Sequence, residues 1–104
     1  MSPDPVNVAS LDGYQTEARR TINRALSDEQ RLLDAAAGLA EEAGEVMGHV
    51  RKHVMRGRPL DRDAVALELG DALWCLAVVA DTLGIALHEV ARRNVEKLRA
   101  RYPD

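Results

Sequence analysis

Apolar residues recur at helical spacing along most of the chain. Tyr14, Ala18, Ile22 and Ala25 share one face of a helix that is predicted to begin near Leu11, and the opposite face of this helix is charged. No segment alternates with a period of two for long enough to predict a strand. The pattern therefore predicts an all-α protein.

The longest predicted helix starts after Ser27 and ends near Arg56. Ser27 is followed three positions later by Gln30, which is the spacing of a capping box, and Gly57 and Pro59 interrupt the helix at its other end. At about 100° per residue, the apolar side chains form one stripe. The stripe consists of Leu32, Leu33, Ala36, Leu39, Ala40, Ala43, Val46, Met47, Val50 and Val54.

Two further helices complete the pattern. Asp61 or Asp63 can cap a third helix, which is predicted to end at Gly84 and is apolar almost all the way round, as expected for a helix buried on most faces. A fourth helix runs from about Ala86 and stops before Pro103. Its apolar face carries Leu87, Val90, Ala91, Val95 and Leu98. Four helices with short connections predict a four-helix bundle-like protomer.

The length of 104 residues indicates one domain with a core that is small relative to its surface. We therefore expect oligomerisation to complete the burial. Residues 1–9, which Pro3 and Pro5 keep extended, are expected to be a flexible N-terminal segment, and residues 10–104 a single domain.

Charge and composition exclude several partners. The chain has 14 Lys and Arg against 17 Asp and Glu, so it lacks the basic excess that binding to a nucleic acid polymer requires. Cys75, the single cysteine, is flanked by Trp74 and Leu76 and is expected to be a buried thiol, which fits a reducing cytoplasm. The start of the chain has no signal-peptide pattern, and Glu68 and Asp71 interrupt the longest apolar run, so no membrane partner is expected.

A cluster of acids lies on the second predicted helix, in the stretch "LAEEAGEVMGH". Glu41, Glu42 and Glu45 occupy an arc of roughly 100° away from the centre of the apolar stripe. Most such clusters are solvated, but exposed glutamates usually gain from a Lys or Arg four residues later, and none follows here. The like-charge pairs instead cost roughly 0.2–0.5 kcal/mol each, a cost that a bound cation would reverse.

Three glycines in the same helix add to this cost. Each is less favourable than Ala by about 1 kcal/mol, unless a neighbour packs closely against it. The three are Gly38, Gly44 and Gly48.

The third predicted helix places Glu68 and Asp71 one turn apart among apolar residues. Residues 64–84 contain no Lys or Arg that could pair with them. A buried carboxylate must be neutralised, paired or bound to a metal, so a metal site, ion pairs with another helix and an exposed edge all remain open. Five carboxylates without clustered Cys or His favour Mg²⁺, with Mn²⁺ as a substitute, over zinc. Because carboxylate-bound Mg²⁺ is typically completed by phosphate groups, the implied substrate is a phosphate compound, with a nucleotide as the leading candidate.

Asn94 falls near the centre of the apolar face of the fourth helix. It is either a structural amide with satisfied hydrogen bonds or a residue that faces the acidic site, and the spacing leaves both open.

The two acidic motifs resemble those of a known family. "EEAGE" followed by "ELGD" is similar to the paired EExxE and ExxD motifs of MazG-like nucleoside triphosphate pyrophosphohydrolases, which belong to the all-α NTP pyrophosphatase superfamily. The flanking stretches "YQTEARRT", "VRKHVMRGRPLD" and "NVEKLRARYP" resemble the short single-domain members, so the resemblance covers nearly the whole chain.

The resemblance implies a helical homodimer or homotetramer that hydrolyses (d)NTP to (d)NMP and pyrophosphate with Mg²⁺. It implies metal binding by five carboxylates, of which Glu41 and Glu42 would also be catalytic, and substrate binding by three side chains on other parts of the helices. The metal ligands would be Glu41, Glu42, Glu45, Glu68 and Asp71, and the substrate-binding residues Lys52, Asn94 and Lys97.

Other functions remain open on the sequence. The chain could be a non-enzymatic helical interaction module, in which acids and glycines only shape a dimer interface. A di-iron bundle would use Glu-x-x-His pairs, and these are absent, since Glu45 follows Glu42 and Gly48 follows Glu45. The same hydrolysis could also act on a modified nucleotide in a housecleaning role.

Overall fold

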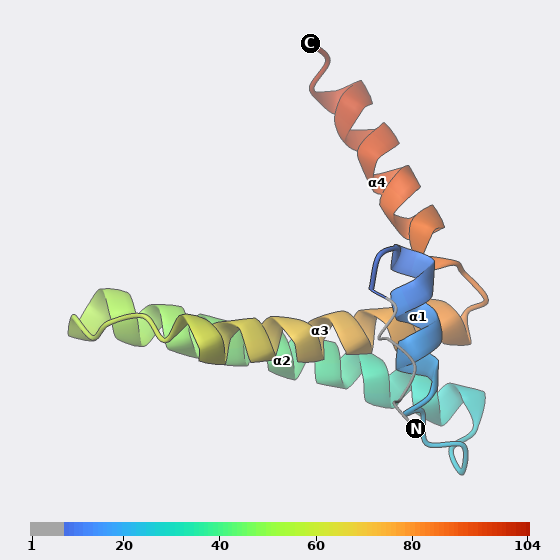
Figure 1. Cartoon of the computed structure of the whole chain (residues 1–104), viewed down its shortest axis with the longest axis horizontal. Coiled ribbons are helices and arrows are strands. Elements are labelled where there is room, and N and C mark those ends of the chain that lie inside the picture. Colours follow the sequence, from blue (N-terminus) through green and yellow to red (C-terminus); the bar gives the residue numbers. More distant parts are fainter. Residues whose placement is uncertain (1–7) are drawn as a thin grey trace, which may run out of the picture.

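The computed structural model describes residues 8–104, which contain four α-helices and no strand (Figure 1). The helices are α1 (Leu11–Arg19), α2 (Asp28–Arg56), α3 (Arg62–Thr82) and α4 (Leu87–Arg101). The all-α prediction is confirmed. Residues 1–7, which make up most of the predicted flexible segment, lie outside the described residues.

Local signals place most of the helix ends. Ser27 and Gln30 form both hydrogen bonds of the predicted capping box at the start of α2, and Gly57, with φ of 64°, ends that helix in the left-handed region. Asp61, rather than Asp63, caps α3 by accepting a hydrogen bond from the Ala64 amide. The third helix ends at Thr82, two residues before Gly84, whose φ of 70° reverses the chain.

The first helix is shorter than the apolar spacing predicts. It ends at Arg19, so Ile22 and Ala25 lie in the connection to α2. The Ala18 carbonyl, which would accept the Ile22 amide in a longer helix, instead accepts hydrogen bonds from the Thr21 amide and hydroxyl and from the Trp74 indole. The side chain of Trp74 on α3 therefore stops α1.

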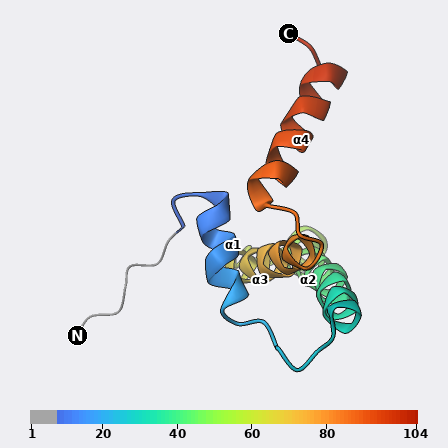
Figure 2. The same ribbon diagram turned by 90° about the vertical axis from the view of Figure 1, so that its right-hand side faces the viewer.

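The second and third helices form an antiparallel hairpin, and α1 crosses α3 near its C-terminal end (Figures 1 and 2). A small core forms where α1, α3 and α4 meet. It contains Ala18, Ala77, Ala80 and Leu87, with Tyr14, Trp74, Leu76 and Ile85 packed around it. Cys75 is a free, buried thiol, as predicted.

Side chains of α1 fix the start of α4. Ala86 at the N-cap of α4 provides no capping side chain. The buried Gln15 instead accepts a hydrogen bond from the Leu87 amide at 2.8 Å and donates one to the Ile85 carbonyl at 3.0 Å. Asp12 accepts from the His88 amide at 2.9 Å. Side chains of α1 therefore accept hydrogen bonds from two amides at the start of α4 that have no partner within their own helix.

Beyond its first turn, α4 extends away from the hairpin (Figure 1). Within residues 8–104 it contacts α1 and α3 but not α2. Only Leu87 of its predicted apolar face is buried, because Val90, Val95 and Leu98 have no helix opposite them. The four helices thus do not close into a bundle within one chain.

No helix within residues 8–104 is, by itself, long and apolar enough to cross a membrane. Only α3 and α4 taken together have that length and composition, and a bend of 101° separates them.

We expect Gln15→Leu to lower the free energy of unfolding by about 1–3 kcal/mol, because Leu keeps the volume but leaves the Leu87 amide and the Ile85 carbonyl unpaired. Urea denaturation measures this change. The neighbouring exposed Thr16→Ala is the control and should be close to neutral. Equal stability of Gln15→Leu and the parent would show that the cross-fold cap does not hold α4.

Candidate metal centre

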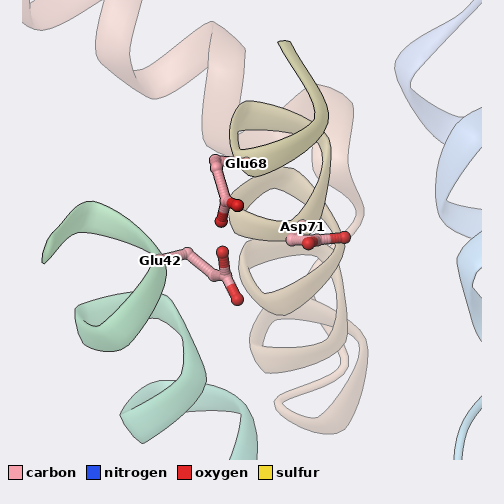
Figure 3. A group of neighbouring side chains, drawn as sticks. All are labelled: Glu42, Glu68 and Asp71. Atoms are coloured by element: carbon pink, nitrogen blue, oxygen red, sulfur yellow. The ribbon is translucent and has the colours of Figure 1, made fainter. Parts of the chain in front are cut away.

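Three of the predicted ligands converge between α2 and α3. Glu42 extends from α2 toward Glu68 and Asp71 on α3 (Figure 3). Each residue offers a carboxylate oxygen, and these oxygens all lie within 4.8 Å of one another. Such an arrangement can surround a single small cation with hard oxygen ligands.

The electrostatics of Glu42 fit a cation site. Its pKa is raised from 4.5 to about 7, first by hydrogen bonding with the Glu68 carboxyl group, then by burial, and then by the negative charges of Glu68, Asp71 and Glu45. The Oε2 atom of Glu42 is buried without a hydrogen-bond partner. A buried, unpaired carboxylate oxygen beside like charges is stabilised by a positive charge placed among them.

No basic side chain supplies that charge. Among residues 8–104, no Lys, Arg or His lies within ion-pair distance of Glu42, Glu68 or Asp71. Ion pairing between helices, which the sequence left open, is therefore not found within this part of the chain. The donor set and its unpaired oxygen fit a hard divalent cation.

The carboxylates are less buried than the apolar character of α3 predicts. Glu42 and Glu68 are half-buried, whereas Asp71 is exposed. The prediction that α3 is buried on most faces holds only for its C-terminal half, because Leu67, Leu69 and Leu73 are exposed. The site therefore lies open to solvent at the less covered end of α3.

The remaining two predicted ligands lie beside the cluster. Glu41 and Glu45 are exposed on α2 and do not belong to the group of three. Glu45 still contributes negative charge at Glu42. Their assignment as ligands, and that of Glu41 as a catalytic residue, stays a prediction.

The predicted substrate-binding residues are further away. Lys52 follows Glu42 by ten residues, which is about 15 Å along the helix axis. It lines a hollow of about 370 Å³ on α2 together with Gly48, Arg51, Met55 and Arg56. Within this protomer, Lys52 is separate from the acidic cluster.

The two residues on α4 are not brought to the cluster either. Asn94 and Lys97 are exposed, and α4 has no contact with α2. Although Asn94 lies on the predicted apolar face of this helix, it is exposed in the isolated protomer, because the face around it meets no other helix. Its role in substrate binding stays a prediction.

Two neighbours of the cluster were not predicted to belong to it. Cys75 lies one turn after Asp71, and its pKa is raised first by burial and then by the charges of Glu42 and Asp71. Tyr14 on α1 has a pKa raised by burial and then by Asp71 and Cys75. The four-residue spacing between Asp71 and Cys75 could have indicated from the sequence that Cys75 lies beside the cluster. The position of Tyr14 could not be found in this way, because it depends on how α1 crosses α3.

Comparisons with known proteins indicate a family to which most of the chain is similar. Residues 30–104 match the sequence model of the MazG nucleotide pyrophosphohydrolase domain, a match that includes α3, α4 and all of α2 except Asp28 and Glu29. Gene 37 protein of Mycobacterium phage L5 is 38% identical over 69 residues, covering 62% of this chain and 60% of that protein. The uncharacterized protein YvdC of Bacillus subtilis (strain 168) is 33% identical over 73 residues, covering 62% of this chain and 69% of that protein.

The chain thus spans less than two thirds of the phage relative, at 60% of its length. No solved structure matches the chain.

The raised pKa of Glu42 predicts a pH dependence of stability in the metal-free protein. The folded-state pKa of about 7 exceeds the ordinary value of 4.5. The stabilising contribution of the protonated carboxyl is therefore complete below the ordinary value and is lost as the pH rises through about 7. We expect the free energy of unfolding, measured with urea and a chelator, to fall between about pH 5 and about pH 8.

Glu42→Gln should reduce this slope, because Gln mimics the protonated form at every pH. Glu29→Gln, in the exposed first turn of α2, is the matched control and should keep the parent's slope. Identical slopes for Glu42→Gln and the parent would contradict the raised pKa of Glu42.

Proposed function

The chain belongs to the MazG nucleotide pyrophosphohydrolase family, and from this membership we propose that it hydrolyses nucleoside triphosphates to the monophosphate and pyrophosphate. The observation that supports this most is the convergence of Glu42, Glu68 and Asp71, with no basic partner among the described residues. The substrate class covers ribo- and deoxyribonucleotides, and a modified nucleotide would undergo the same reaction.

In this proposal, Glu42, Glu68 and Asp71 hold Mg²⁺, for which Mn²⁺ can substitute. The bound ion would lower the pKa of a water molecule and offset charge on the phosphates. Glu45, which already adds negative charge at Glu42, attracts the same ion. Glu41 lies beside Glu42 on the exposed side of α2, where it can orient the attacking water.

A second copy of the chain is part of the proposal. Only part of the apolar stripe of α2 is covered within the protomer, where Leu39 and Val46 are half-buried. Leu33, Met47 and Val54 are instead 72%, 64% and 68% exposed. These three recur at multiples of seven residues, the spacing of a coiled-coil seam. We name the exposed stripe of Leu33, Met47, Val50 and Val54 the α2 seam.

The α2 seam supports a homodimer or homotetramer, because a seam of this kind packs against another helix. An assembly would also allow Asn94 and Lys97 of one copy to approach the carboxylates of another. Within one copy, α4 does not contact α2. Lys52 and these two residues are the proposed contacts of the substrate.

The reaction is tested with purified protein and the eight common NTPs and dNTPs, with and without Mg²⁺ or Mn²⁺. We expect water to attack the α-phosphorus. The bond between that phosphorus and the oxygen that bridges the α- and β-phosphates should then break, giving monophosphate and pyrophosphate. Heavy oxygen from labelled water should appear in the monophosphate. Label confined to pyrophosphate would contradict attack at the α-phosphorus.

Variants separate the roles of the carboxylates. Glu68→Gln should lower kcat/KM at least about 100-fold, because it removes a ligand from the metal site. Glu29→Gln, far from the site at the start of α2, should keep full activity. Glu41→Gln should lower kcat while preserving Mn²⁺ affinity. A folded, metal-binding parent without activity on all eight substrates would favour a modified nucleotide, and a parent that binds no metal would favour the interaction module.

Light scattering after size-exclusion chromatography tests the assembly. We expect the mass of a dimer or tetramer for the parent, and a smaller mass for Met47→Asp, which would bury a charge in the α2 seam. Asn23→Asp is the control, because it adds the same charge in the connection before α2 and keeps the oxygen that accepts from the Ala25 amide. A monomeric parent would contradict the proposed assembly.

A further inference from the structure

Gly38 on α2 lies directly against the Cys75 side chain on α3. A Cβ atom added to Gly38 would lie 2.9 Å from the Cys75 sulfur, which is too close for a carbon and a sulfur that are not bonded. Gly44 and Gly48, the other two glycines of α2 that the sequence marked as unfavourable, have free space beside them. A Cβ atom at either position would meet nothing within 4 Å. Gly38 alone among these three is required by packing.

This contact lies one helical turn from the acidic cluster on both helices. Glu42 follows Gly38 by four residues on α2, and Asp71 precedes Cys75 by four residues on α3. Because the helices are antiparallel, both steps lead in the same direction, about 6 Å along the hairpin. The contact and the cluster are therefore neighbours along one interface.

The separation of the two helices controls the geometry of the cluster, because Glu42 comes from α2, and Glu68 and Asp71 come from α3 (Figure 3). Mg²⁺ demands near-ideal distances to its ligands, so a few tenths of an ångström between the helices change its binding. Ala35, the one buried side chain of α2, lies three residues before Gly38. Small residues thus allow the two helices to pack closely at this point.

The sulfur of Cys75 cannot easily yield to a larger residue. Cys75 is 7% exposed, and its side chain has one torsion angle. One of the three staggered positions of that angle is disfavoured in a helix. A methyl group at position 38 therefore forces the backbones apart or moves the sulfur into the packed interface.

We propose that Gly38 and Cys75 are positioning residues, which set the α2–α3 separation at which Glu42, Glu68 and Asp71 bind a divalent cation. The proposal rests on the proposed function, because it concerns the same site. Neither residue contacts the substrate. Their effect is on the distance between the ligands.

The test is Mn²⁺ affinity, measured by titration calorimetry on the full chain, alongside thermal unfolding of the metal-free protein. Gly38→Ala should weaken Mn²⁺ binding about 10- to 100-fold, as loss of a supporting residue does in other metal sites. Gly44→Ala, the same substitution in open space on the same helix, should leave the affinity unchanged and raise the thermal stability, since Ala is the better helix former.

The double variant Gly38→Ala/Cys75→Ala supplies the decisive comparison. Removing the sulfur makes room for the new methyl group, so the double variant should regain the parent's affinity. A loss of affinity that came from the changed helix propensity at position 38, and not from the contact with the sulfur, would not be reversed by the second substitution. Parent-like affinity in Gly38→Ala, or a double variant as weak as Gly38→Ala, would overturn the positioning role alone. A parent that binds no Mn²⁺ would overturn both this inference and the metal site of the proposed function.

Discussion

Three carboxylates within 4.8 Å of one another repel, and the packing of α2 on α3 must hold them together against that repulsion. The interaction with the Glu68 carboxyl group, burial and the neighbouring negative charges raise the pKa of Glu42 to about 7, so a proton relieves part of the repulsion. A cation among the oxygens would relieve it more completely, and would also satisfy the unpaired Oε2 of Glu42. The acidic cluster is thus a cost to the metal-free fold and the source of its proposed chemistry.

The same constraint explains how α2 is used. Its small residues, Ala35 and Gly38, and its acid Glu42 lie on the side of α3, whereas the exposed side chains of the α2 seam lie on another side. Small residues allow the close approach that brings the carboxylates together. The apolar surface that this arrangement leaves exposed is suited to another helix, and the outward course of α4 leaves a further apolar face uncovered. The proposed metal site and the proposed assembly therefore use different faces of the same helix.

Features determined by neighbouring residues could be predicted from the sequence. The capping box at Ser27, the left-handed Gly57 and the cap at Asp61 depend on local hydrogen bonds and backbone sterics. Features determined by distant residues could not. The end of α1 depends on Trp74, which binds the Ala18 carbonyl from 56 positions away. Which acids converge depends on the rotation of α2 relative to α3, a quantity that helical periodicity leaves free, so five carboxylates were predicted and three meet.

The most direct test of the acidic cluster as a cation site is anomalous X-ray diffraction from crystals of the protein soaked in Mn²⁺. The expected result is a manganese peak between α2 and α3, bound by oxygens of Glu42, Glu68 and Asp71, at roughly the 2.0–2.2 Å typical of small divalent cations on oxygen ligands. A manganese peak elsewhere, with these three carboxylates free of metal, would contradict the site on which the proposed activity rests.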